Sequence, residues 1–380
     1  MTSRTTALPD FPWDSLAALK QRASAHEEGL VDLSVGTPVD PTPEVVRRAL
    51  TEASDAPGYP QVWGTPDLRE AVVDWFARRR GVPGLDPDGV LPTLGSKELI
   101  SWLPTLLGLG EGDTVLHPEL AYPTYDVGAR LAGATPRPMR SLTGLGPMTR
   151  ATAPRLLWLN TPGNPSGQVL GVGHLRKVVA WARQHDVVVA SDECYAELDW
   201  RQDPGEDASG RAAASTPSLL DPRVCDGDPA GLLVVYSLSK QSSMAGYRAA
   251  FAAGDPALVH RLLEVRRHAG MMMPWPVQRA MRAALRDDDH VRAQKERYAR
   301  RRATLSRALT GAGFRVDHSE AGLYLWSTRD EDTWATLDWL AERGILAAAG
   351  TFYGPTGGRH VRIALTATDE RIDAAAARLG

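Results

Sequence analysis

Lys240 is the residue whose type and surroundings most clearly suit chemistry, in the segment YSLSKQSSMAGYR that follows an apolar run. Its amine can form a Schiff base with an aldehyde. Ser237, Ser239 and Arg248 add hydroxyl and guanidinium donors that suit a phosphate dianion. Pyridoxal phosphate carries both an aldehyde and a phosphate, so the segment predicts a site for that cofactor. The alternative is a charged surface loop, because lysine and arginine side chains are usually solvated.

Two further strand ends carry groups that could act on the ring of the same cofactor. In SDECY, Asp192 closes an apolar strand and could keep the pyridine nitrogen protonated, so that the ring withdraws electrons from the substrate Cα. Tyr195 could reach the phenolate oxygen of the ring, and so could the side-chain amide of Asn164 in NTPGNPSG. A bare turn is the alternative for NTPGNPSG, because Asn, Pro, Gly and Ser all favour turns.

A phosphate could also be bound at GSKE, residues 95–98, where Gly and Ser open a predicted helix. The first turn of a helix presents backbone amides that are free to bind an anion. A plain N-cap explains the same residues equally well.

The segments GSKE, PELAYPTY, NTPGNPSG, SDECY and SLSK, followed by Arg248, occur in this order and closely resemble the fold-type I aminotransferase family. The resemblance covers nearly the whole chain. It implies an enzyme, a transaminase with pyridoxal 5′-phosphate as cofactor, and an α/β fold of the fold-type I PLP-dependent transferases. The large PLP-binding domain, with a mostly parallel sheet between helix layers, would be residues 45–265. A smaller α+β domain would combine residues 1–44 and 266–380.

Several residue roles follow from the resemblance. Lys240 would form the Schiff base, Asp192 would pair with the pyridine nitrogen, and Tyr195 with Asn164 would contact the phenolate oxygen. Tyr122 would stack on the ring. The phosphate would be bound by Ser96, Lys97, Ser237, Ser239 and Arg248, joined by Tyr59 of the neighbouring subunit. That last contact implies a homodimer whose active sites are shared. Thr161 and Ala349 depart from prolines that are common in the family, and only loop rigidity should change.

The substrate α-carboxylate would be bound by Arg362 in HVRIAL and by the backbone near Gly36 in SVGTP, with Asn164 close by. A planar guanidinium suits bidentate contact with a carboxylate. An edge-strand charge is the alternative for Arg362, since antiparallel strands often alternate apolar and charged residues. In a ping-pong transamination Lys240 would also act as the base at Cα, which requires a pKa lowered by burial and nearby positive charge.

The segments SDECYAELDW, GSKELISWLPTLL and RRHAGMMMPWPVQRAM also resemble a narrower group, the actinobacterial N-succinyldiaminopimelate aminotransferases. This resemblance implies that L-glutamate donates its amino group to N-succinyl-2-amino-6-oxopimelate, on the route to diaminopimelate and lysine. Such a substrate carries several carboxylates, for which Arg266, Arg267 and His268 are candidate partners. Helix-surface charges are the alternative for these three residues.

Other functions remain possible. Aspartate, LL-diaminopimelate or aromatic aminotransferases share the cofactor motifs. A non-catalytic PLP-binding effector domain of a regulator is disfavoured, because the motifs begin near Gly36 and leave no room for a DNA-binding region. A nucleotide-binding protein is disfavoured too, since no G-x-G-x-x-G follows the first strand and no G-x-x-x-x-G-K-[ST] occurs.

These motifs need a scaffold that gathers strand ends. Apolar, β-branched strands are predicted at residues 114–118, 155–160, 187–193, 232–239 and 249–254, and helices at 66–80, 96–107, 124–131 and 174–185. Function should lie at the carboxyl ends of such strands. Earlier, a helix at 13–22, a strand at 30–38 and a helix at 44–53 are expected. A long helical pattern runs from residue 255 to 310, and strands follow at 314–318, 322–327, 345–350 and 360–365. Residues 203–228 are expected to be a solvated excursion.

Composition points to small-molecule partners. The 380-residue chain is 43% hydrophobic and 23% charged, and its net charge of −3 gives no reason to expect nucleic acid or an anionic membrane. Cys194 and Cys225 match neither a disulfide framework nor a zinc site, so no metal is predicted. No run approaches the roughly 20 apolar residues that cross a bilayer, and the N-terminus lacks an apolar signal region. The sequence therefore predicts a cytoplasmic enzyme acting on amino acids and keto acids.

Overall fold

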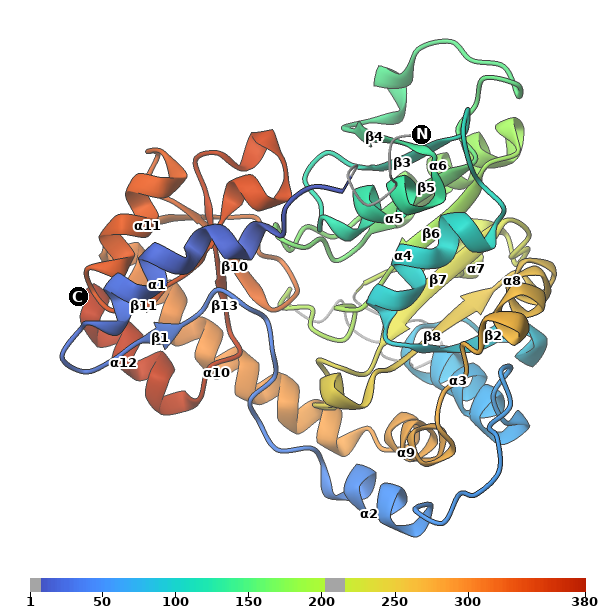
Figure 1. Ribbon diagram of the computed structural model, residues 1–380, viewed down its shortest axis with the longest axis horizontal. Helices are drawn as coiled ribbons and strands as arrows, with labels where there is room; N and C mark the ends of the chain where they lie inside the picture. Colours follow the sequence, from blue (N-terminus) through green and yellow to red (C-terminus); the bar gives the residue numbers. More distant parts are fainter. Residues whose placement is uncertain (1–7, 202–215) are drawn as a thin grey trace.

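A seven-stranded sheet forms the centre of the larger lobe in the computed structural model, which describes residues 8–201 and 216–380 (Figure 1). In spatial order its strands are β2 (Val90–Leu94), β8 (Ala249–Gly254), β7 (Leu232–Ser237), β6 (Val188–Asp192), β5 (Leu156–Asn160), β3 (Thr114–Pro118) and β4 (Thr135–Met139). Only β8 runs antiparallel to its neighbours, β2 and β7, among the described strands of this sheet. The expected mostly parallel sheet is confirmed.

Helices cover both faces of this sheet because its central strands are apolar on both sides. On one face, residues of α3 (Pro66–Arg79), α6 (Val172–His185) and α9 (Trp275–Leu285) share a core with the strands. On the other face the covering helices are α4 (Ser96–Leu106), α5 (Thr124–Ala132) and α8 (Pro256–Ala269). Neighbouring residues of a strand alternate between the two cores: Leu157 and Leu159 face the first, and Leu156 and Trp158 face the second. The predicted layers of helix, sheet and helix are therefore present.

Two strands of the sheet were not expected from the sequence. Both contain proline: β2 reads VLPTL and β4 reads TPRPM. Proline removes a ladder hydrogen bond and argues against a central strand. Because β2 pairs only with β8 and β4 only with β3, both are edge strands, where one side of the backbone needs no partner. The sequence pattern alone could not indicate that position.

The smaller lobe is built on a four-stranded antiparallel sheet, in the order β12 (Ala348–Ala349), β13 (Val361–Ala364), β10 (Tyr324–Thr328) and β9 (Arg315–Asp317). Around it lie α10 (Asp289–Gly311), α11 (Thr333–Ala341) and α12 (Asp369–Leu379). The N-terminal segment joins this lobe through α1 (Ala17–Ser24) and through β1 (Val31–Asp32), which pairs with β11 (Ile345–Leu346). Figure 1 shows the blue N-terminal and red C-terminal segments side by side in this lobe. The α+β second lobe is thus confirmed.

The helical pattern expected over residues 255–310 is present as three helices, α8, α9 and α10. Gly270 ends α8 with a left-handed φ of +68°, and Pro274 precedes α9. Helix α9 then packs on α3 and on α2 (Glu44–Glu52). The domain boundaries expected from the sequence stay a prediction. The packing of α9 with the core of the larger lobe favours a later boundary, just before α10.

The excursion expected over residues 203–228 lies partly outside the described residues, up to residue 215. The described remainder contradicts a solvated loop, since residues 216–221 are buried. Thr216 donates a hydrogen bond to the Asp199 carboxylate at 2.7 Å, and the Leu219 amide donates to Glu193 at 2.7 Å. The chain turns inward here because buried carboxylates need donors. A short helix, α7 (Pro222–Cys225), follows. Among the described residues, no helix is long and apolar enough to cross a membrane.

Candidate active site

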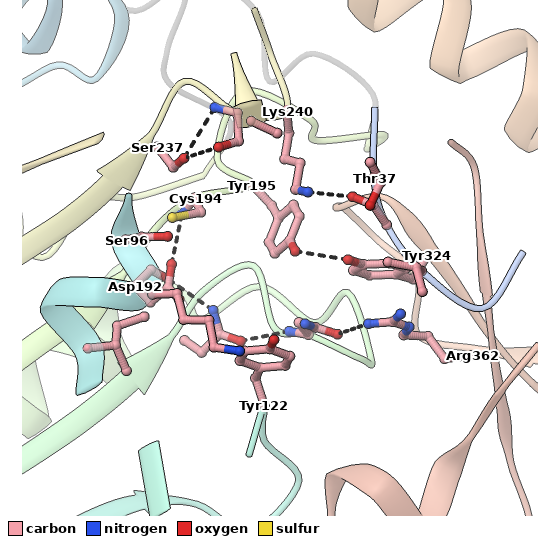
Figure 2. Close-up of a pocket in the computed structure, with 18 of the residues that line it drawn as sticks. Thr37, Ser96, Tyr122, Asp192, Cys194, Tyr195, Ser237, Lys240, Tyr324 and Arg362 are labelled. Carbon is pink, nitrogen blue, oxygen red and sulfur yellow. Dashed lines mark hydrogen bonds between the residues drawn. The ribbon is translucent and has the colours of Figure 1, made fainter. Parts of the chain in front are cut away.

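A cavity of about 290 Å³ lies at the carboxyl ends of β5, β6 and β7, where the smaller lobe and the N-terminal segment meet the sheet (Figure 2). Except for Tyr59 and the candidate succinyl-binding cations Arg266, Arg267 and His268, every residue that the sequence predicted for the cofactor or the substrate lines it. Those residues are Gly36, Ser96, Lys97, Tyr122, Asn164, Asp192, Tyr195, Ser237, Ser239, Lys240, Arg248 and Arg362. The structure therefore brings together segments that are up to about 330 residues apart in the sequence.

Lys240 follows the end of β7 and extends into the cavity. Its Nζ donates a hydrogen bond to the carbonyl oxygen of Gly36 (Figure 2). Burial lowers the pKa of this amine, and the positive charges of Arg362 and Arg248 lower it further. A lowered pKa increases the fraction of neutral amine, which is the form that can attack an aldehyde or accept a proton.

Asp192 ends β6 with both carboxylate oxygens engaged. Oδ2 accepts a hydrogen bond from the Tyr125 hydroxyl at 2.8 Å, and Oδ1 accepts from the backbone amide of Cys194 at 3.1 Å. Burial raises the pKa of this carboxyl, although these hydrogen bonds oppose the rise. Within the described chain no lysine or arginine forms an ion pair with it. A buried carboxylate of this kind is suited to a cationic partner supplied by a ligand.

A third group of side chains forms an anion cradle beside the start of α4. The Ser237 hydroxyl donates to the Ser239 hydroxyl at 2.8 Å. Helix α4 begins after Gly95 with no side-chain cap, so its first amides are free. The guanidinium of Arg248 lies directly against Gly95, where a Cβ would collide with it. Two hydroxyls, free helix amides and a guanidinium together suit a phosphate group.

Arg362, on β13, forms the opposite side of the cavity. Its side chain is only 2% exposed and stacks on the ring of Tyr324, 3.9 Å from the ring centroid. Nη1 donates to Oδ1 of Asn164 at 3.1 Å, and Nη2 donates to the carbonyl oxygen of Ser34 at 2.7 Å. Nε has no partner, and no described carboxylate neutralises the charge. A buried guanidinium with a free donor is suited to bind a carboxylate ligand.

Tyr324 and Asn160 are among the lining residues that sequence reasoning missed. Tyr324 was expected only as part of a strand, yet its hydroxyl lies 3.1 Å from that of Tyr195. Asn160 stands at the end of β5, in register with Asp192 on β6. Its side chain accepts from the Asn164 amide at 2.7 Å and donates to the Asp192 carbonyl at 3.0 Å, so it fixes the loop that carries Asn164. The position of Asn160 at the end of a predicted strand could have indicated its role.

Three expected cations do not reach the cavity. Arg266 is fully buried in α8, where Nη1 donates to Glu98 at 2.8 Å and Nη2 to the carbonyl of Met271 at 3.3 Å. Its proposed contact with a substrate carboxylate is therefore wrong, because its charge is already compensated. Arg267 and His268 lie in the last turn of α8 and do not line the cavity either. Tyr59 is 96% exposed and also stands apart from the cavity of its own chain.

Comparison with known proteins defines the class to which this fold and site belong. The family model for aminotransferase class I and II matches residues 28–379, and the chain is a member of that family. The protein is accordingly a pyridoxal-phosphate-dependent transaminase.

Its relatives include enzymes with different substrates. The chain is 59% identical over 375 residues to a probable aminotransferase of Mycobacterium tuberculosis, covering 99% of this chain and 86% of that protein. It is 56% identical over 372 residues to the 4-dedimethylamino-4-oxo-anhydrotetracycline transaminase of Streptomyces rimosus, covering 98% and 99%. A solved structure described as a probable N-succinyldiaminopimelate aminotransferase of Thermus thermophilus is 30% identical, with a TM-score of 0.83, covering 97% and 99%.

The cavity fits pyridoxal phosphate on three independent observations. The anion cradle at α4 suits the phosphate, and the carboxylate of Asp192 lacks the cation that a protonated pyridine nitrogen would supply. Lys240 presents an amine of lowered pKa in the same cavity.

Proposed function

We propose that this enzyme transfers the amino group of L-glutamate to N-succinyl-2-amino-6-oxopimelate and forms N-succinyl-LL-2,6-diaminopimelate by a ping-pong mechanism. The observation that carries the amino-acid specificity is the buried guanidinium of Arg362, whose Nε is free and whose charge no described carboxylate neutralises. Both substrates of a ping-pong reaction occupy the same site in turn, and both carry an α-carboxylate that Arg362 would bind. The similarity to the Thermus protein supports the choice of acceptor.

The roles of the cofactor-binding residues are part of this proposal. Bound pyridoxal phosphate supplies an electron-withdrawing ring that acidifies the Cα–H of an amino acid attached to it. The side chain of Asp192 would hold a proton on the pyridine nitrogen, and the hydroxyl of Tyr195 and the amide of Asn164 would contact the phenolate oxygen. Tyr122 would lie against the ring. The phosphate would be bound by Ser96, the amide of Lys97, Ser237, Ser239 and Arg248.

Lys240 has two tasks in this scheme. Its Nζ would hold the cofactor covalently, and the same Nζ, once free, would accept the proton from the substrate Cα. The lowered pKa of Lys240 supports the second task, because a neutral amine is needed near pH 7. The Gly36 carbonyl, which accepts from Nζ, keeps the amine directed toward the substrate side of the cavity.

The side chain of Lys97 is our candidate for the distal carboxylate of the succinyl group. Its Nζ lies 5.7 Å from the ring centroids of both Phe11 and Tyr122, at the edge of the cavity. Lys97 is exposed, and no ion pair to it occurs in the described chain. The two rings limit where the ammonium can move, so its charge stays near the substrate entrance.

A second candidate acceptor is a polycyclic ketone. The 56% identity with the Streptomyces tetracycline-pathway transaminase favours it. Two aromatic rings that line the cavity could also pack on a flat substrate: the ring centroids of Trp13 and Tyr122 are 6.3 Å apart. A polycyclic ketone without an α-carboxylate would not use Arg362 in the second half-reaction, whereas the glutamate half-reaction would still need it.

We also propose a homodimer with shared active sites. Tyr59 supports this assembly, since a tyrosine that is 96% exposed in one chain is unusual unless another molecule covers it. In the dimer its hydroxyl would contact the phosphate in the neighbouring subunit. The cytoplasmic location stays a prediction from the sequence.

The test is a pair of half-reactions followed by visible absorption. Addition of L-glutamate to the holoenzyme should bleach the cofactor band, and N-succinyl-2-amino-6-oxopimelate should restore it. Recovery with the anhydrotetracycline ketone and not with the succinylated acceptor would replace the proposed acceptor with the second candidate. A band that L-glutamate leaves unchanged would refute the proposed donor.

A further inference from the structure

Tyr324 contacts several residues of the active site, although no role has been assigned to it so far. Its hydroxyl lies 3.1 Å from the hydroxyl of Tyr195, and the two rings meet edge to face with centroids 5.7 Å apart. Both side chains are at least nine-tenths buried. Figure 2 shows the two hydroxyls pointing toward each other between Lys240 and Arg362.

Arg362 and Gly36 fix the position of Tyr324. The guanidinium of Arg362 covers its ring at 3.9 Å from the centroid. Gly36 lies against its hydroxyl so closely that a Cβ on Gly36 would overlap the oxygen. The carbonyl of that same Gly36 accepts from Lys240 Nζ. The hydroxyl of Tyr324 therefore has little freedom except in the direction of Tyr195.

Charges around the pair give the two hydroxyls different roles. Burial opposes ionisation of Tyr324, but the positive charge of Arg362, that of Lys240 while its amine is protonated, and the hydrogen bond with Tyr195 together lower the pKa of this phenol, against an opposing effect of Asp192. Burial raises the pKa of Tyr195 well above its ordinary value, and the neighbouring Tyr324 raises it further. Tyr195 thus keeps its proton, and Tyr324, the more acidic of the two phenols, is the better hydrogen-bond donor, which leaves the single proton of Tyr195 for an acceptor on the ligand.

We propose that Tyr324 is a positioning residue for Tyr195: its hydroxyl fixes the direction of the Tyr195 hydroxyl and so sets its contact with the phenolate oxygen of the cofactor. This inference rests on the proposed role of Tyr195. The ring of Tyr324 has a separate task, which is to support the guanidinium of Arg362. The two tasks can be separated, because phenylalanine would keep the ring and lose only the hydroxyl.

The first test is a pH titration of the visible spectrum of the holoenzyme, which reports the protonation state of the attached cofactor. Tyr324→Phe should shift the midpoint of this titration relative to wild type. The kcat of the half-reaction with L-glutamate should fall about fivefold, the effect of one hydrogen bond. The KM for L-glutamate should stay unchanged, because the ring still supports Arg362. An unchanged midpoint together with an unchanged kcat would overturn the proposal.

A double-substitution cycle tests whether Tyr324 acts through Tyr195. In a Tyr195→Phe background, adding Tyr324→Phe should change neither the midpoint nor the kcat further. If the two effects add, Tyr324 acts independently of Tyr195 and the proposal is wrong. Neither measurement involves the amino acceptor. Both results would therefore still test the role of Tyr324 if the acceptor in the proposed function were incorrect.

Two more variants test whether the effect is specific to Tyr324. One removes a different buried hydroxyl, and the other displaces the Tyr324 hydroxyl without removing it. Tyr236 is 1% exposed, donates to Gln241 Oε1 at 2.5 Å and belongs to the core on one face of the sheet. Tyr236→Phe should leave the titration midpoint at the wild-type value. Gly36→Ala should push the Tyr324 hydroxyl away from its place and shift the midpoint in the same direction as Tyr324→Phe. A shift in Tyr236→Phe equal to that in Tyr324→Phe would contradict a specific role.

Discussion

Arg362 donates a hydrogen bond through Nη1 to Oδ1 of Asn164 at 3.1 Å, and this contact joins the smaller lobe to the loop after β5 of the larger one. With its oxygen engaged, the Asn164 side chain has its NH₂ group as the donor that it could offer to a ligand. The proposed carboxylate-binding residue therefore orients a residue proposed to contact the cofactor. In the proposed mechanism, substrate binding and cofactor alignment would share this side-chain contact.

Replacement of Arg362 by alanine should raise the KM for every carboxylate substrate by roughly 100-fold, since removal of one partner of a buried charged contact costs about 3 kcal/mol. Steady-state kinetics with L-glutamate and with a series of keto acids measure this effect. Arg362→Lys should recover only part of the loss, because an ammonium cannot make the bidentate contact. An unchanged KM in the alanine variant would assign the carboxylate to another residue.

The variant Lys240→Ala should fold normally, bind pyridoxal phosphate without a covalent bond and lose turnover. Borohydride reduction followed by mass spectrometry measures covalent attachment, and circular dichroism checks the fold. Lys177→Ala, a change at an exposed position of α6, is the matched control and should behave as wild type. Retained turnover in Lys240→Ala would refute the proposed mechanism.

Removal of one partner of the buried ion pair between Arg80 and Glu193 should destabilise the fold strongly, because the other charge stays buried without compensation. Their side chains are 2% and 0% exposed, with Nη2 and Oε2 3.0 Å apart. Arg80→Leu leaves the Glu193 charge uncompensated and should lower the free energy of unfolding by about 3–5 kcal/mol. Because Glu193 follows Asp192 directly, the holoenzyme should also lose cofactor more readily.

Urea unfolding measures this loss, and the exposed pair Arg48–Glu52 provides the comparison. Its atoms are 3.9 Å apart and both side chains are mostly exposed, so Arg48→Ala should change stability by less than about 0.5 kcal/mol. Equal effects at the two pairs would mean that burial does not determine the strength of these contacts.

His290 should make the protein less stable in mild acid. Its Nε2 lies 2.8 Å from the Ser242 hydroxyl, and burial lowers its pKa below 6.5 although Asp287 and Asp288 oppose the change. Above pH 6.5 the imidazole is neutral in both the folded and the unfolded chain. As the pH falls from 6.5 through the lower folded pKa, only the unfolded chain gains a proton, so stability decreases.

Thermal unfolding at pH 8 and at pH 5.5 measures this dependence. His290→Gln should reduce the difference in Tm between the two pH values, since it removes one of the titrating groups. The chain has nine histidines, so part of the difference should remain. A variant with the full wild-type difference would show that His290 does not contribute.

A mixed dimer tests the proposed sharing of active sites. Tyr59→Ala should weaken cofactor retention in its own homodimer, and Lys240→Ala should be inactive in its own. A dimer with one subunit of each kind should contain one complete site and regain about half of the wild-type activity. Differently tagged subunits allow its purification. A mixed dimer with no gain over the Tyr59→Ala homodimer would contradict the shared site.

Most residues of the site could be predicted from the sequence because they follow apolar strands. Lys240, Asp192 and Asn164 each come at or just after the end of a strand that is buried on both faces, and parallel strand ends meet at one edge of a sheet. Site residues that do not lie at this edge of the sheet were harder to predict from the sequence. Tyr324 lies within a β-strand of the smaller lobe, where an aromatic residue is ordinary, and only its contact with Tyr195 distinguishes it.

The wrong expectations came from tertiary contacts that local patterns do not contain. Arg266 looked like a free cation because its partner, Glu98, is 168 residues away. Thr216 looked like part of a solvated loop because the Asp199 carboxylate that needs its hydroxyl lies in another segment. The two proline-containing strands were missed because edge position depends on strand order and not on composition.

The two sides of the cavity come from different lobes of the protein. Groups proposed to bind the cofactor lie at the edge of the seven-stranded sheet, whereas Gly36, Tyr324 and Arg362 come from the N-terminal segment and the smaller lobe. A redesign of substrate choice can therefore exchange residues 33–37 together with the strand that carries Tyr324, while the catalytic core is left as it is. Related sequences that diverged by the same route should differ in these two segments more than at the strand ends of the sheet.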